Sequence, residues 1–507
     1  MENMVHQIRS GKNYAFMKTE MPLNENTLNR LAKTIMIKHS VGYARAVEIL
    51  GKFRLNLICD RNIAYSPALQ AALLTAVNTG KRAFHGGVFV SMPPGVPCLL
   101  NWPGGQTLNL IVQSFGAKFV GLDHSTFTHT LYFGRCVDPV EDSLLIACTG
   151  WRGGIVPANT AIDLNSRSDF ALGGILAAAH GVARGFLRVS GLSTRHVQAP
   201  EGFSLWRPDL DWTASEAEGP ELELLPRNLW MLGLGHLGQA FLWNFAMLPY
   251  ANPGEATFLL QDFDRAVQGN FTSGLLCEEQ NIGKAKTRIC ADWLEARGFQ
   301  TIITERPFDE QTKRTGNEPF VACCGFDSAE PRRLLESAGF DLVIECALGA
   351  DTPRFDRIML HTFPQAARTA SDIWGEVPSN EHLDENILNA FKSEGDCGIL
   401  AETLARKAVS TSFAGAYAGA MVGGELLRAL HGGVRCELIH AHLRHGEQPK
   451  VVLKNENYLN RVARSGYVPV VTDIFGLDSQ PRSQRMVHHN MCAKKSFDWF
   501  RNVGAQT

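Results

Sequence analysis

The chain of 507 residues is too long for one hydrophobic core, and its 45% hydrophobic and 20% charged residues indicate two or three folded domains rather than a disordered chain. A formal net charge of −2 gives no concentrated cationic surface, so nucleic-acid binding is not expected. No run of about twenty apolar residues is present, so a membrane span is not expected either.

The N-terminal residues lack the apolar core of a secretory signal, and most of the twelve cysteines are scattered through apolar runs. Both features predict reduced thiols and a cytoplasmic location. No Cys-x-x-Cys pair occurs, so no structural metal is expected.

Residues 1–197 are predicted to form a first α/β domain. Arg54–Asn62 is typical of the first strand of a nucleotide-binding fold, and a helix-like run, Pro67–Val77, follows it. Where the glycines of a phosphate-binding turn would stand, the chain has Asp-Arg-Asn, beginning at Asp60. Because a carboxylate there would repel a phosphate, this domain is predicted to be inactive. Residues 198–225, rich in Pro, Ser and acidic residues without periodicity, are predicted to be a linker.

A glycine-rich turn opens the second domain, predicted to span residues 226–447. The apolar strand Leu229–Leu232 runs into Gly233-x-Gly235-x-x-Gly238 and out into a helix. The first glycine permits a tight turn, the second lets the backbone approach a phosphate, and the third lets helix and strand pack closely. The free N–H groups at the helix N-terminus then favour an anion, so a nucleotide is expected here.

Polar residues follow this turn at fixed distances. Asp262 ends the next apolar strand, where a carboxylate can accept hydrogen bonds from ribose hydroxyls, and Asp264 follows two residues later. Asn270 lies eight residues beyond Asp262, Lys286 sixteen beyond Asn270, and Asp327 ends a third apolar run. A nicotinamide-dependent oxidoreductase would explain the glycine turn and Asp262, but it assigns no role to the later residues and is the weaker hypothesis.

A crossover segment is predicted near residues 352–400, and it contains the best candidate for a reactive thiol. Cys397 follows Asp396, which is a plausible N-cap, and the helix dipole there would lower the pKa of the thiol. Cys324 and Cys346 lie in apolar runs and are weaker candidates. An inert cysteine is the alternative at each position.

Two small-residue helices indicate an internal duplication. With Phe170 aligned to Phe413, Asp169–Leu187 and Ser412–Leu430 have equal length and share five identities. Two unrelated α/β domains with Ala/Gly-rich helices are the alternative. Residues 448–507 are predicted to be a partly flexible C-terminal extension with one strand-like run.

Together these residues and spacings resemble the ThiF/MoeB superfamily, whose fold ubiquitin-activating enzymes share. The matching positions, over about 220 residues, are Gly233, Gly235, Gly238, Asp262, Asp264, Asn270, Lys286 and Asp327. The resemblance implies an α/β fold of two Rossmann-like ThiF-type domains, the N-terminal one degenerate and the C-terminal one active. They would form a single-chain pseudodimer, and further self-association stays open.

The resemblance also implies an activity. ATP and Mg²⁺ would be the cofactors, and the C-terminal carboxylate of a ubiquitin-like protein would be adenylated. The matched glycines, aspartates and lysine of the turn region would bind ATP, Asn270 and Lys286 would take part in catalysis, and Asp327 would hold the metal. Cys397 would then carry the substrate as a thioester to a conjugating-enzyme-type acceptor.

One departure from the family pattern concerns charge. Ser273 stands where the family has an arginine, so the cation that faces the triphosphate must come from elsewhere. Lys284 and Arg265 are near in sequence, and Arg45 and Arg152 are candidates from the other domain.

Three further interpretations follow from the resemblance. A sulfur-carrier activator would work without its own cysteine, and a catalytically dead scaffold would explain Ser273. The layout itself is similar to the BilD-type activating enzymes of bacterial antiviral operons, which join an inactive adenylation-like domain to an active one.

Overall fold

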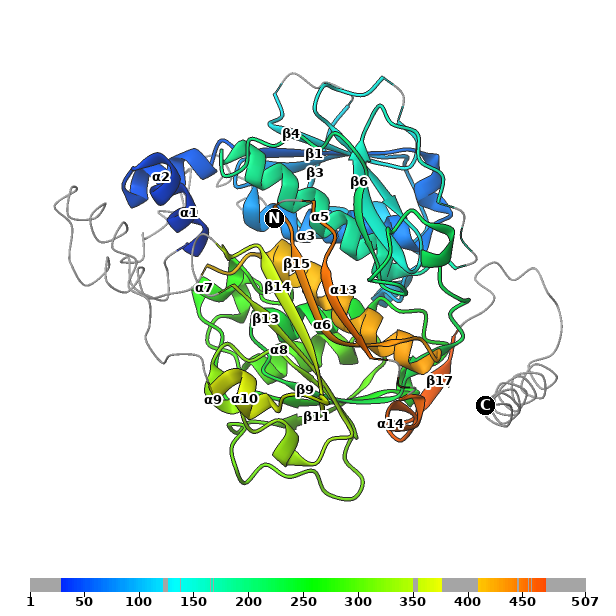
Figure 1. Ribbon diagram of the computed structural model, residues 1–507. Helices are drawn as coiled ribbons and strands as arrows, with labels where there is room; N and C mark the ends of the chain where they lie inside the picture. The colour runs from blue at the N-terminus through cyan, green and yellow to red at the C-terminus, as the bar shows by residue number, and fades with distance from the viewer. Residues whose placement is uncertain are drawn as a thin grey trace, which may run out of the picture.

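The computed structural model describes residues 29–470 except 122–125, 137, 165, 167, 350–353, 376–408, 445, 455 and 457. Two β-sheets face each other across a layer of helices (Figure 1). The strands of one sheet come from residues 54–204 and those of the other from residues 228–454. The fold is therefore α/β with two domains, as predicted.

The sheet of the first domain has the strand order β3-β2-β1-β4-β5-β6-β7. The first five of these strands are parallel, and β6 and β7 are antiparallel to their neighbours. The strands are β1 (Arg54–Cys59), β2 (Gly87–Ser91), β3 (Lys118–Phe119), β4 (His129–Phe133), β5 (Leu144–Cys148), β6 (Arg152–Pro157) and β7 (Glu201–Ser204).

The second sheet repeats this arrangement with one more antiparallel strand, in the order β11-β10-β9-β12-β13-β14-β15-β16. Its strands are β9 (Asn228–Leu232), β10 (Thr257–Gln261), β11 (Gln300–Thr304), β12 (Val321–Cys324), β13 (Leu342–Leu348), β14 (Arg357–Phe363), β15 (Arg435–His442) and β16 (Lys450–Lys454). The same order and directions in both sheets confirm the duplication.

The described helices are α1 (Arg30–His39), α2 (Tyr43–Leu50), α3 (Pro67–Ala83), α4 (Leu108–Ser114), α5 (Ala171–Val189), α6 (His236–Ala246), α7 (Gln268–Phe271), α8 (Lys286–Glu295), α9 (Ala329–Arg332), α10 (Ala370–Gly375), α13 (Ser412–Leu430) and α14 (Leu459–Ala463). Helices α3 and α5 of the first domain pack against α6 and α13 of the second (Figure 1). Glycines also let helices of the second domain lie close together: a Cβ at Gly419 of α13 would lie 2.7 Å from the carbonyl oxygen of Ala240 on α6.

The predicted linker is wrong for residues 201–204, because β7 lies in the first sheet beside β6. Phe203 is buried in the core from this strand. A strand of four residues is too short for an alternation of apolar and polar residues to be recognised in the sequence.

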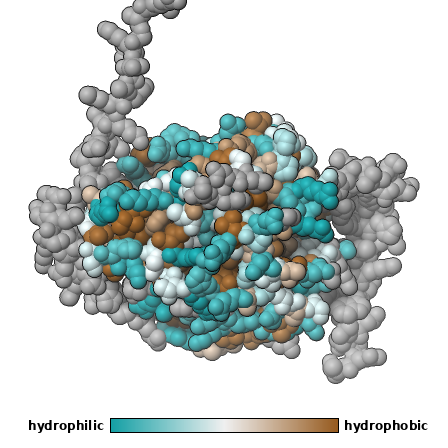
Figure 2. All heavy atoms as spheres, turned by 90° about the horizontal axis from the view of Figure 1, so that it is seen from above, coloured by the Kyte–Doolittle hydropathy of each residue, from teal (hydrophilic) through white to brown (hydrophobic). Residues whose placement is uncertain are grey.

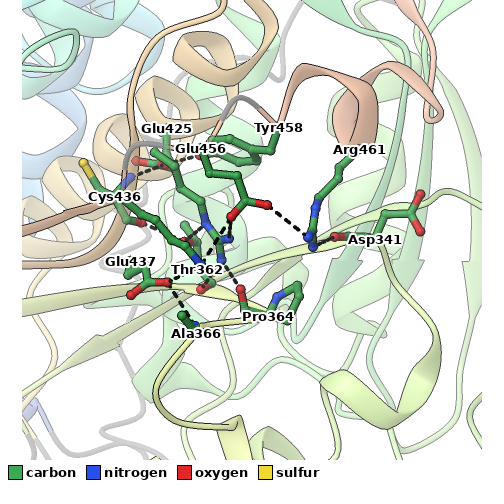
Figure 3. A network of polar contacts seen from close by, with 12 residues as sticks. Asp341, Thr362, Pro364, Ala366, Glu425, Cys436, Glu437, Glu456, Tyr458 and Arg461 are labelled. Carbon is green, nitrogen blue, oxygen red and sulfur yellow. Dashed lines mark hydrogen bonds and ion pairs between the residues drawn. The ribbon is translucent and has the colours of Figure 1, made fainter. Parts of the chain in front are cut away.

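The predicted C-terminal extension also needs correction, because residues 450–470 belong to the second domain. Strand β16 extends its sheet, and β17 (Tyr467–Pro469) pairs with β8 (Leu224–Pro226). Figure 3 shows a polar network in which Glu425 of α13 contacts Tyr458. This buried carboxylate accepts hydrogen bonds from the Tyr458 hydroxyl and, at 3.1 Å, from the N–H of Cys436. The network ties the segment around α14 to the core.

The surface seen from above interleaves hydrophilic and hydrophobic side chains (Figure 2). Among the described helices, none has the length and apolar character that a membrane span requires.

Candidate active site

The glycine turn lies between β9 and α6, at the carboxyl end of the strand. Gly233 has a φ of +76°, a conformation that favours glycine. A Cβ at Gly238 would lie 2.0 Å from the carbonyl oxygen of Gly233, so only glycine lets α6 start this close to the strand. A Cβ at Gly235 would meet no atom within 4 Å. Gly235 is also the N-cap of α6 and provides no side-chain acceptor for the helix, so the turn is open at the point where an anion would bind.

Asp262 lies beside this turn, directly after β10. One oxygen of its carboxylate accepts a hydrogen bond from the N–H of Leu234 at 2.6 Å, and the other accepts from the N–H of Asp264 at 2.7 Å. Burial raises the pKa of Asp262, while the charge of Lys286 and these two N–H donors oppose the shift. The carboxylate thus joins the glycine turn to the next strand end.

Lys286 is the first residue of α8, and it is 8% exposed. Its Nζ lies 2.6 Å from the carboxylate of Asp264, whose side chain is half exposed. A solvated helix lysine, the alternative explanation of this residue, is therefore excluded. The structure brings Lys286, Asp262 and Asp264 together at one edge of the sheet, next to the open turn.

Asn270 belongs to the short helix α7, and its side-chain oxygen accepts a hydrogen bond from the N–H of Val267 at 2.9 Å. This contact fixes the loop, and a catalytic role for Asn270 stays a prediction. Ser273 is buried and contributes no charge.

Asp327 lies three residues beyond the end of β12, and its side chain is exposed. A cation from the other domain lies near it. That cation is Arg30, the first residue of α1. Burial lowers the pKa of Arg30, and the negative charge of Asp327 opposes this shift. Burial lowers the pKa of His236, at the start of α6, to about 4, and the charge of Arg30 makes a smaller contribution in the same direction.

The other suggested cations do not take this position. Arg45 is exposed and pairs with Glu48 on its own helix. Arg152 is buried in the first domain, where its guanidinium donates to the carbonyl of Ala214 at 3.4 Å. Lys284 pairs with Asp292, and Arg265 donates to the carbonyl of Gly283 at 2.9 Å within the same loop. No motif in the sequence marks Arg30, since only the packing of α1 brings it to the second domain.

Cys397 lies outside the described residues. The last described helix before it, α10, contains Trp374. The guanidinium of Arg332, which lies five residues after Asp327 in the sequence, stacks on the ring of Trp374 at 4.3 Å from its centroid. Burial raises the pKa of both Cys324 and Cys346, so neither offers a thiolate at neutral pH.

The corresponding turn of the first domain is filled by the side chain of Asp60. One carboxylate oxygen of Asp60 accepts from the N–H of Asn62 at 2.8 Å, and the other accepts from the N–H of Arg135 at 2.8 Å. The carboxylate of Asp60 therefore accepts hydrogen bonds from backbone N–H groups that a phosphate would need.

A cavity of about 600 Å³ lies elsewhere, beside the amino ends of β4 and β5. His129, Asp142 and Arg188 are among its lining residues, and none of the predicted site residues is. Nucleotides in such α/β folds bind at the opposite, carboxyl ends of the strands.

The fold and the site define a fused pair of Rossmann-like ThiF-type domains, of which the second retains an open glycine turn. The family models of the BilD N-terminal domain and the BilD C-terminal domain match residues 54–205 and 225–433. A "Bacterial E1-like protein BilD" from Collimonas sp. (strain OK412) is 36% identical over 431 residues, which are 83% of this chain and 92% of the relative. The chain belongs to the BilD family of bacterial E1-like proteins.

Two solved structures match smaller parts of the molecule. E. coli MccB is 14% identical with a TM-score of 0.31, over 46% of this chain and 62% of that protein. PaaA is also 14% identical, with a TM-score of 0.30, over 45% of this chain and 64% of that protein.

Proposed function

We propose that this protein is an ATP-dependent activating enzyme that adenylates the C-terminal carboxylate of a ubiquitin-like protein. The observation that carries the proposal is that three functional groups lie at the same edge of the sheet. The open first turn of α6 at Gly235, the carboxylate of Asp262 and the buried ammonium of Lys286 all lie there. Membership of a family of E1-like proteins supports the same reaction.

In the proposed reaction, an oxygen of the substrate carboxylate attacks the α-phosphorus of ATP. The bond from this phosphorus to the bridging oxygen breaks, and pyrophosphate leaves with the electron pair. The N–H groups at the start of α6 and the ammonium of Lys286 would stabilise the negative charge that develops. Asp262 would hold the ribose, and Asn270 would donate to the phosphates.

Mg²⁺ fits the exposed carboxylate of Asp327. The described residues contain no group of three side chains that could hold a metal by themselves, so the phosphates of ATP would supply further ligands, as is usual for this ion. When bound, the metal neutralises phosphate charge. Arg30 interacts electrostatically with Asp327 and would supply the cation in place of the arginine missing at Ser273.

The later steps rest on the sequence resemblance. We assign Cys397 as the thiolate that takes over the substrate, with AMP as the leaving group, and a conjugating-enzyme-type protein as the acceptor of the thioester. The setting would be the cytoplasm of a bacterium, in antiviral defence. A sulfur-carrier activator without its own thioester is the second candidate, because the described thiols Cys324 and Cys346 have raised pKa values.

Two other functions fit less well. A nicotinamide-dependent oxidoreductase gives no role to the pair of Lys286 and Asp264. A dead scaffold gives no reason for a partly buried arginine of the other domain to lie near Asp327.

Pyrophosphate release tests the proposal, with ATP, Mg²⁺ and a ubiquitin-like protein present together. We expect release only when all three are present, and no release would contradict the proposal. Asp327→Ala should abolish release with an unchanged Tm, because the side chain is exposed. Retained activity in this variant would show that Asp327 is not the metal ligand. A reductant-sensitive adduct that Cys397→Ala loses would separate the thioester mechanism from the sulfur-carrier one.

A further inference from the structure

A buried arginine of the first domain holds a loop of the nucleotide-binding domain. Arg82, in the last turn of α3, has no exposed side-chain surface. Its guanidinium donates to the carbonyl oxygens of Gly274 at 3.1 Å and of Cys277 at 3.0 Å, and it lies 3.4 Å from the carboxylate of Glu278. Asn78, one turn earlier on α3, donates to the carbonyl of Leu275 at 3.0 Å.

The same loop is bonded to the glycine turn. The side-chain oxygen of Gln239, on α6, accepts a hydrogen bond from the N–H of Leu276 at 3.1 Å. Its amide nitrogen donates to the carbonyl of Leu234 at 3.1 Å, inside the turn. The N–H of Leu234 in turn donates to Asp262. A continuous set of hydrogen bonds therefore joins α3 of the first domain to the turn and to the carboxylate beside it.

Stabilisation of the fold alone explains this arginine poorly. Burying a guanidinium costs several kcal/mol even when it is paired, and the Nη1 of Arg82 has no hydrogen-bond partner among the described residues. The loop it holds follows Ser273 directly, at the place where the charge of the family pattern is missing. Because the guanidinium is fully buried, it acts on the position of the loop rather than as a charge in the open turn.

We propose that Arg82 and Asn78 are positioning residues for the nucleotide site, through which the inactive domain sets the geometry of the glycine turn in the active one. This inference rests on the proposed function, since it assumes that the turn binds ATP. It gives the first domain, which has lost its own phosphate-binding turn, a part in the reaction of the second.

The experiment compares two variants that each remove one buried interdomain hydrogen bond from α3. Asn78→Leu removes the bond to the loop. Thr75→Val removes the bond that the Trp243 indole N–H makes to Thr75 Oγ1 at 3.0 Å, away from the loop. The Kd for ATP with Mg²⁺ is measured by calorimetry on the full chain, and the Tm of each variant is measured beside it.

We expect similar losses of Tm in the two variants. The Kd should rise about fivefold, the equivalent of one hydrogen bond, only in Asn78→Leu. An equal Kd in both variants would overturn the inference. Arg82→Lys keeps the charge but loses the forked contacts, and it should weaken ATP binding further.

A double-mutant cycle adds a readout that general destabilisation would not give. Gln239→Met breaks the set of hydrogen bonds at the turn and leaves α3 intact. If Asn78 acts through Gln239, the combined effect on Kd should be smaller than the product of the single effects. A combined effect on Kd equal to the product of the single effects would contradict the proposed route.

The wild-type measurements separate this inference from the proposed function. Wild-type protein that binds ATP but releases no pyrophosphate would contradict adenylation, while the comparison of Kd values would still decide the inference. Wild-type protein that does not bind ATP would overturn both.

Discussion

The side chains of the ion pair Lys286 and Asp264 differ in exposure to solvent, and this difference matters for nucleotide binding. The side chain of Lys286 is 10% exposed and that of Asp264 is 51% exposed. A nearly buried ammonium needs an anionic partner, whereas an exposed carboxylate can return to water at little cost. Lys286 can therefore exchange Asp264 for a phosphate oxygen when a nucleotide enters.

Lys286→Ala should lower the rate of pyrophosphate release by about 10²- to 10³-fold, the usual effect of losing one group that stabilises transition-state charge. Lys284→Ala is the matched control, because that lysine lies two residues earlier and pairs with Asp292. Steady-state rates of the two variants check this expectation. Equal rates would show that Lys286 is only structural.

Buried histidines should make the fold sensitive to acid. Burial, with a smaller effect of Arg184, lowers the pKa of His180 on α5 from its usual value of 6.5 to about 3. Since the folded protein resists this protonation, the contribution of His180 to stability is present above pH 6.5 and is lost as the pH falls toward 3.

Replacing His180 by Gln should therefore reduce the slope of unfolding free energy against pH by about 1.4 kcal/mol per pH unit in this window. Urea unfolding between pH 4 and 6.5 measures the slope. His196→Gln, a variant of an exposed histidine, is the control. An unchanged slope in His180→Gln would contradict the assignment.

Much of the site was predictable from residue types and spacing. The three glycines, Asp262, Asp264 and Lys286 lie together where the motif places them. The contacts of Arg30 and Arg82 were not predictable, because each joins residues about 200 or more positions apart in the chain. No local pattern of residue types encodes a contact between domains.

At the scale of elements, two glycines of the turn serve different purposes: one is needed for packing and the other leaves space for a ligand. Gly238 is needed for the fold, because its Cβ position is taken by the carbonyl of Gly233. Gly235 faces open space, so the fold does not need a glycine there. Its φ of −73° lies outside the left-handed region that favours glycine.

Alanine at these two positions should therefore have different effects. Gly238→Ala should destabilise the protein by about 1–3 kcal/mol or more, because α6 must move away from β9. Gly235→Ala should keep the wild-type Tm but weaken ATP binding by about tenfold or more, since its Cβ would stand where a phosphate approaches. Thermal unfolding and calorimetry distinguish the two. Unchanged ATP binding in Gly235→Ala would contradict the position assigned to the phosphate.

Long elements were predictable and short edge elements were not. The helices α5 and α13 were visible in the sequence as 19-residue runs rich in small residues. Strands β7 and β16, of four and five residues, lie at the edges of their sheets, so each pairs with only one neighbouring strand.

For the whole molecule, the proposed function gives the two similar domains different tasks. The first fills its own turn with Asp60 and presents Arg30 to the second. The second keeps an open turn but has lost the arginine of the family pattern at Ser273. We therefore propose that the first domain provides a cation for the site of the second.

Arg30→Ala should lower the rate of pyrophosphate release about 10²-fold or more, because a cation near the phosphates is lost. Arg45→Ala, on the neighbouring helix α2 of the same domain, is the control and should keep the wild-type rate. Equal rates of the two variants would show that the active site lies within the second domain alone.

The most direct test is a crystal structure of the full chain with ATP and Mg²⁺. The account predicts the triphosphate against the N–H groups that begin α6, the ribose at Asp262, and the metal at Asp327. A turn filled by side chains, or a nucleotide bound away from Gly235, would contradict it.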